Sequence, residues 1–108
     1  MNAKTLKALK GSIRKWQRIV NGTGKDKAAN NCPLCALSAA FGCAGCPVSK
    51  ATGEELCEGT PYTPWVDHQT TVHINRLKKG EGKRVVGKCR TCRKLAREEL
   101  EYLKSLLP

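Results

Sequence analysis

The seven cysteines are the residues of this sequence with the clearest capacity for chemistry, because six of them form C-x-x-C pairs. A C-x-x-C turn presents two sulfur atoms to one metal ion, and three such pairs in one short chain rarely arise by chance. The pattern therefore predicts metal binding, with zinc as the expected ion and one or two ions bound. The predicted ligands are Cys32, Cys35, Cys43, Cys46, Cys57, Cys89 and Cys92.

Three other uses of the thiols agree less well with the sequence. Disulfides would leave one of the seven cysteines unpaired, and the N-terminus lacks the apolar segment of a secretion signal, which predicts a reducing, cytoplasmic location. An iron–sulfur cluster is a minority interpretation, because the Cys46-Pro47 step resembles the last ligand of a ferredoxin but the spacings differ. A thioredoxin-like role for "CPLC" would need a surrounding βαβ pattern, which the sequence lacks.

The sequence leaves open which cysteines share an ion. In one grouping, four of the first five cysteines form a compact site. Cys89 and Cys92 then form a second site, which His68 and His73 complete through their H-x-x-x-x-H spacing. In the other grouping, a treble clef, the first and the last C-x-x-C pairs surround one zinc ion. A single histidine of this kind is more often a surface or core residue than a ligand, so neither is among the predicted ligands.

The elements that position these ligands must be small. Leucine, isoleucine, valine and phenylalanine together make up about a fifth of the 108 residues. Such a core rarely contributes more than about 3–5 kcal/mol, so the bound metal would have to brace the fold. An apolar stripe at steps of three and four predicts an amphipathic helix over residues 3–20, and a similar stripe predicts a C-terminal helix. The C-terminal stripe consists of Ala96, Leu100, Leu103 and Leu107.

Between these helices the sequence predicts extended structure. Residues 70–77, "TTVHINRL", alternate and are rich in β-branched side chains, and "KKGEG" resembles a turn, so a β-hairpin is predicted over 70–88. The two prolines of "TPYTPW" also favour extended backbone. The predicted fold class is a small α+β domain: a treble-clef-like zinc knuckle with a short hairpin, flanked by an N-terminal and a C-terminal amphipathic helix.

All 108 residues are expected to form a single metal-braced domain. Its parts are a basic helix at 1–24, the cysteine knuckles at 31–66, and a segment at 70–108 that holds the hairpin, the second knuckle and the last helix. No stretch is long or apolar enough to span a membrane.

The charge is distributed unevenly. Residues 1–31 carry a net +7, residues 32–75 a net −3 and residues 76–108 a net +7. Two basic segments around a cysteine-rich middle indicate a polyanionic partner, and nucleic acid bound through its phosphate backbone is the expected one. The residues predicted to contact it most directly are Lys7, Arg14, Lys15, Arg18, Lys83, Arg84, Lys88, Arg90 and Arg93. The alternative is that these basic residues form an ordinary solvated surface with no partner.

The first cysteine block carries a resemblance to known proteins. Its motifs are C-x-L-C at Cys32 and Cys35, C-x-G-C-P from Cys43, and C-x-x-T-P-Y from Cys57, with Trp65 following. This pattern resembles a group of small Cys-rich metal-knuckle proteins that come largely from bacteriophages. The resemblance implies a phage-type metal-knuckle protein in the host cytoplasm and favours keeping 32–57 together as one unit. It implies no activity.

Two functions compete with a nucleic-acid-binding accessory protein, which is expected to be non-enzymatic. "VDHQ" at 66–69 is similar to the Asp-His step of HNH nucleases, in which His68 would be the general base and Asp67 would help to hold a Mg²⁺-type ion. A module that docks on a host protein would instead use Trp16, Tyr62 and Trp65 as anchors. No feature indicates a small-molecule substrate.

Overall fold

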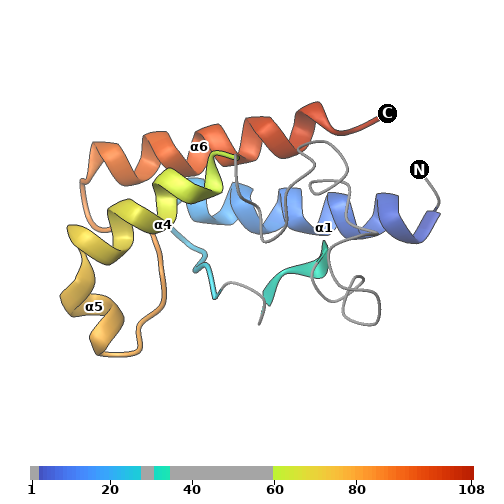
Figure 1. The fold of residues 1–108 in the computed structure, drawn as a ribbon. Helices are drawn as coiled ribbons and strands as arrows, with labels where there is room; N and C mark the ends of the chain where they lie inside the picture. Colours follow the sequence, from blue (N-terminus) through green and yellow to red (C-terminus); the bar gives the residue numbers. More distant parts are fainter. Residues whose placement is uncertain (1–2, 28–30, 35–59) are drawn as a thin grey trace.

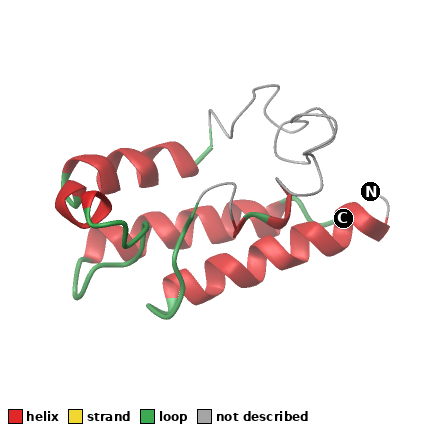
Figure 2. Cartoon of the chain, turned by 90° about the horizontal axis from the view of Figure 1, so that it is seen from below, coloured by secondary structure: helices red, strands yellow, loops and turns green. Residues whose placement is uncertain are grey.

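The computed structural model describes residues 3–27, 31–34 and 60–108, and these residues form helices and loops (Figures 1 and 2). The helices are α1 (Ala3–Val20), α4 (Tyr62–Thr71), α5 (Ile74–Lys78) and α6 (Arg90–Ser105). The two long helices, α1 and α6, pack side by side and antiparallel, so the two chain ends lie at the same end of the molecule. α4 packs against α6, and α5 follows it after a sharp turn.

The helix α1 occupies the range that its apolar stripe predicts. Its inner face buries Leu9, Ser12, Trp16 and Ile19, while its lysines and arginines other than Lys15 are exposed. Gly11, which would weaken an isolated helix, is needed here because a Cβ atom at this position would lie 3.1 Å from a ring carbon of Pro33. The helix is therefore amphipathic and is covered by the rest of the chain along one side.

Aromatic packing joins α1 to α4 at the centre of the core. Trp16 and Trp65 are 3% and 0% exposed, and their rings meet edge to face at a centroid distance of 5.3 Å. Tyr62 packs edge to face on Trp16 at 5.9 Å. From α6, Ala96, Leu100 and Leu103 complete the core. The three rings are therefore core residues, and the two tryptophans are not accessible as anchors for a partner protein.

The predicted α+β fold is wrong, because residues 70–88 form no β-hairpin. The first arm of the expected hairpin is the end of α4 and the whole of α5, and Lys83 pairs in an isolated bridge with Asp26 rather than with a second strand. Thr70 and Thr71 donate their hydroxyl hydrogens to the carbonyl groups of Val66 and Asp67, which satisfies these side chains within a helix. The treble-clef-like knuckle needs that hairpin, so this part of the predicted fold is also wrong.

The alternating residue types at 70–77 suggested a strand, but their apolar members do not form one buried face. Val72 is 64% exposed and Ile74 is 36% exposed, so neither contributes to the core. Gly80 and Gly82 do adopt the positive φ angles of a turn, but the turn follows a helix. Similarly, the prolines of "TPYTPW" start α4: Pro61 is its N-cap, and Pro64 lies in its first turn, where no backbone donor is lost.

A buried carboxylate holds the loops to the helices. Asp26 is 0% exposed and accepts a hydrogen bond from Lys15 Nζ at 2.9 Å and one from Trp65 Nε1 at 3.1 Å. Its backbone N–H and C=O pair with the C=O and N–H of Lys83, at N–O distances of 2.6 and 3.1 Å. One residue thereby links α1, α4 and the loop that precedes α6.

Candidate metal centre

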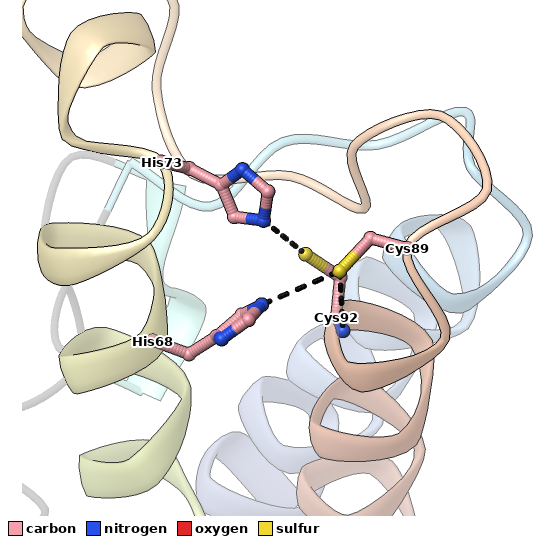
Figure 3. A group of neighbouring side chains, drawn as sticks. All are labelled: His68, His73, Cys89 and Cys92. Carbon is pink, nitrogen blue, oxygen red and sulfur yellow. Dashed lines mark hydrogen bonds between the residues drawn. The ribbon is translucent and has the colours of Figure 1, made fainter.

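Two histidines and two cysteines meet where the end of α4 faces the start of α6. His68 lies in the last turn of α4, and His73 is the N-cap of α5. Cys89 is the N-cap of α6, and Cys92 lies in its first turn. Both imidazole rings point toward the two sulfur atoms (Figure 3). Segments more than fifteen residues apart thus contribute to one cluster.

The distances within the cluster suit a tetrahedral ion. Cys89 Sγ lies 3.4 Å from His68 Nε2, and Cys92 Sγ lies 3.2 Å from His73 Nε2. One possible ligand atom from each residue lies within 4.8 Å of those of the other three. With zinc bonds of about 2.0–2.1 Å to nitrogen and about 2.3 Å to sulfur, a tetrahedron has edges of about 3.3–3.8 Å. The four residues can therefore hold a metal ion after only small adjustments of the side chains.

The start of α6 prepares its two sulfur atoms for a cation. The N–H of Cys92 points at Cys89 Sγ, at an N–S distance of 3.5 Å. The pKa of the Cys92 thiol, which is 0% exposed, is raised, mainly by burial and also by the neighbouring Cys89; hydrogen bonds from the Val86 backbone and the Gln69 side chain oppose this shift. A bound cation would add the attraction that keeps a buried thiolate deprotonated.

The surroundings of His73 favour the form that a metal needs. Burial, the neighbouring His68 and the positive charge of Arg76 all lower the pKa of His73. A neutral imidazole has a lone pair for coordination, whereas a protonated one has none. The two rings lie edge to face with a centroid distance of 4.9 Å, which brings their Nε2 atoms to the same side of the cluster.

Gln69 donates hydrogen bonds to one sulfur atom of the cluster and to the loop before α6. This side chain is 1% exposed, and its Nε2 donates to Cys92 Sγ at 3.3 Å and to the carbonyl oxygen of Arg84 at 3.1 Å. It therefore fixes the position of a sulfur ligand and of the loop before α6. The sequence offered no signal for this role, because glutamine has no metal chemistry of its own and the contact depends on how α4 packs on α6.

The cluster agrees with the first of the two groupings that the sequence left open. Cys89 and Cys92 lie with His68 and His73, as in the first grouping. Cys32 is not one of the four; it packs against the hydrophobic core and is close enough to Glu99 to raise the pKa of that carboxyl group. The remaining predicted ligands, Cys35, Cys43, Cys46 and Cys57, lie outside the described residues, and so does most of a site built from the first five cysteines.

The geometry of His68 bears on the nuclease hypothesis. A general base must reach a water molecule beside the substrate, but His68 Nε2 faces the sulfur of Cys89. Asp67 is exposed, whereas His68 is half-buried. Within the described residues, the hairpin that would carry the nuclease site is replaced by helix and loop. His68 is thus placed to bind a metal ion rather than to activate water.

The predicted phosphate-binding residues fall into two surfaces and one buried position. Lys7, Arg14 and Arg18 are exposed on α1. Lys15 differs, since its side chain is 11% exposed and pairs with Asp26. A second group lies in the loop before α6 and at the start of α6, and consists of Lys83, Arg84, Lys88, Arg90 and Arg93, all at least partly exposed.

Comparisons with known proteins add no relative to this description. No family model matches the sequence, and the searches of curated proteins and of solved structures give no match. Among the described residues, no helix has the length and apolar character needed to cross a membrane.

Proposed function

We propose that this protein is a zinc-braced helical protein that binds nucleic acid through the phosphate backbone, and that it belongs with the phage-type Cys-rich proteins its first cysteine block resembles. The observation that carries the zinc part is the close approach of four donors, all within 4.8 Å of one another, contributed by His68, His73, Cys89 and Cys92. Two imidazoles and two thiolates are a borderline-soft set, which favours zinc over magnesium or calcium.

The proposed role of the zinc ion is structural. Four protein ligands fill a tetrahedral shell, so no position stays open for water or substrate. The ligands join the α4–α5 turn to the start of α6, and Gln69 of α4 adds hydrogen bonds to Cys92 and to the Arg84 carbonyl. The ion would therefore add a strong link between these two regions.

Zinc content tests this part of the proposal. Native mass spectrometry with elemental analysis gives the number and identity of the bound ions. The double variant Cys89→Ser, Cys92→Ser should hold one zinc ion fewer than the wild type, whatever the first five cysteines bind. The matched control is Thr91→Ser, which changes an exposed residue between the two cysteines and is no metal ligand. A double variant that keeps every zinc ion of the wild type would refute the site.

The nucleic-acid part is supported by charge and by the position of the aromatic rings. Five exposed cations follow one face of α1, which contains no acidic residue: Lys4, Lys7, Lys10, Arg14 and Arg18. A centre of two neutral imidazoles, two thiolates and Zn²⁺ carries no net charge, so it would leave the cations around it uncompensated. With both tryptophans buried, stacking on single-stranded bases is disfavoured, and the backbone of duplex DNA or RNA is the better ligand.

Salt-dependent binding tests the second part. Fluorescence titration of a labelled duplex at about 50 and 200 mM salt should show a loss of affinity of roughly a hundredfold or more, since each released counterion contributes to the slope. Affinity that hardly changes with salt would contradict phosphate contacts and would favour a protein partner instead.

A further inference from the structure

The segment between the two pairs of metal ligands is strongly cationic. Residues 74–88 follow His73 directly and end just before Cys89, and they contain six basic residues and one acidic residue, Glu81. We call this segment the ligand loop. Its basic residues are Arg76, Lys78, Lys79, Lys83, Arg84 and Lys88.

Besides the metal ligands at its two ends, few of the described residues fix the position of the ligand loop. Within it, α5 spans five residues and has no buried side chain. The second arm is fixed by buried Val85, by the bridge from Lys83 to Asp26 and by the hydrogen bond from Gln69 to the Arg84 carbonyl. The first arm is attached to His73 and, through Arg76, pairs with Glu81. A metal ion that binds His73 and Cys89 would close the loop at both ends and lower the entropy of its open forms.

Within the loop, one carboxylate forms ion pairs with two partly exposed guanidinium groups. Glu81 Oε2 lies 3.1 Å from Arg76 Nε and 3.7 Å from Arg84 Nη2, and both arginine side chains are about one-third exposed. This contact brings the two arms together and leaves Lys78, Lys79 and Lys88 exposed around it. The loop therefore presents several cations on a surface whose shape depends on closure at the metal centre.

We infer that the ligand loop, together with the first turn of α6, is the main phosphate-binding surface for double-stranded DNA, and that the metal ion is required to form it. This inference rests on the function proposed above. Residues 76–94 carry nine basic residues and one acidic residue in 19 positions, whereas α1 carries six basic residues in 18 positions, and one of these, Lys15, is paired with Asp26. The denser surface meets more phosphates over the same length of duplex. A surface that is already ordered also loses less entropy on binding.

Two triple variants that remove the same charge from different surfaces test this inference. The loop variant is Lys78→Gln, Lys79→Gln, Lys88→Gln, and the helix variant is Lys4→Gln, Lys7→Gln, Lys10→Gln; all six lysines are exposed. Binding to a labelled duplex of about 20 base pairs is measured at several salt concentrations for zinc-loaded protein. The loop variant should weaken binding roughly tenfold or more and lower the salt slope by about 3, and the helix variant should have a clearly smaller effect.

A third measurement addresses the metal ion itself. The variant Cys89→Ser, Cys92→Ser should bind the duplex at least about tenfold more weakly than the wild type, while circular dichroism shows that most helix is retained. If that variant loses its helices, the surface does not form without the metal ligands, and the comparison of the two triple variants still decides whether the ligand loop is the main surface, because both keep all four ligands.

The outcomes separate this inference from the proposed function. A helix variant that binds as weakly as the loop variant, or more weakly, overturns the ligand loop as the main surface and leaves nucleic-acid binding intact. If the variant Cys89→Ser, Cys92→Ser keeps its helices, lacks the zinc ion of the cluster and still binds the duplex with wild-type affinity, the metal requirement is overturned. If zinc-loaded wild type binds no duplex even at low salt, both the inference and the nucleic-acid function fail, while zinc content still tests the metal centre separately.

Discussion

Replacing Glu99 by glutamine should change how the stability of this protein depends on pH. Glu99 lies on the inner face of α6, is 3% exposed, and its Oε2 has no hydrogen-bond partner among the described residues. Burial raises the pKa of this carboxyl group to about 7, with further increases from the charges of Asp26 and Cys32 and a decrease from Lys15. The folded protein therefore favours the protonated acid.

The size of the effect follows from the difference between the folded and unfolded states. The ordinary pKa is 4.5 and the folded value is about 7; at about 1.36 kcal/mol per pH unit, the full difference is about 3 kcal/mol. Because the folded pKa is the higher one, this contribution to stability is complete below about pH 4.5 and is lost as the pH rises through about 7. Wild type should therefore lose about 3 kcal/mol relative to Glu99→Gln between these limits.

Urea unfolding of both zinc-saturated proteins from pH 5 to pH 8 measures this difference. Protonation of the metal ligands at low pH affects both proteins equally, so it cancels when one free energy of unfolding is subtracted from the other. Glu98→Gln, an exposed change on the same helix, should give no comparable pH-dependent difference. A constant difference between wild type and Glu99→Gln would show that Glu99 titrates alike in both states, which would refute the reasoning.

Three further changes test the contacts around the metal centre and the core. Gln69→Leu removes the donor to Cys92 Sγ and should weaken zinc binding about 10–100-fold in a chelator competition; exposed Gln17→Leu is the control, and equal affinities would exclude a supporting role. Asp26→Asn leaves the poorly exposed Lys15 ammonium unpaired and should cost about 3 kcal/mol or more in urea unfolding. A cost below about 1 kcal/mol would mean that Lys15 simply turns into solvent. Zinc at about 1,000 times its dissociation constant should stabilise wild type by about 4 kcal/mol. Chelation should therefore lower the melting temperature more in wild type than in Cys92→Ser, and equal shifts would contradict a structural ion at this site.

The failures of the sequence-based predictions share one cause. The segment 70–77 has the residue types of a strand, but a strand needs a partner, and none of the described residues pairs with this segment; the isolated bridge at Lys83 is made with Asp26. Local side-chain bonds of Thr70 and Thr71, together with the packing of Gln69 under Cys92, favour helix instead. Lys15 was likewise expected in solvent, because its buried partner Asp26 is eleven residues away in the sequence.

The order of residues alone determined the two long amphipathic helices, since the 3.6-residue period of their apolar side chains is a local property. It also determined that the C-x-x-C pair at Cys89 begins a helix. Which other donors meet that pair was decided by tertiary structure, because the packing of α4 on α6 brings His68 and His73 to the sulfur atoms. Coordination depends on distances of a few ångströms between remote segments, and such distances are fixed by packing rather than by spacing along the chain.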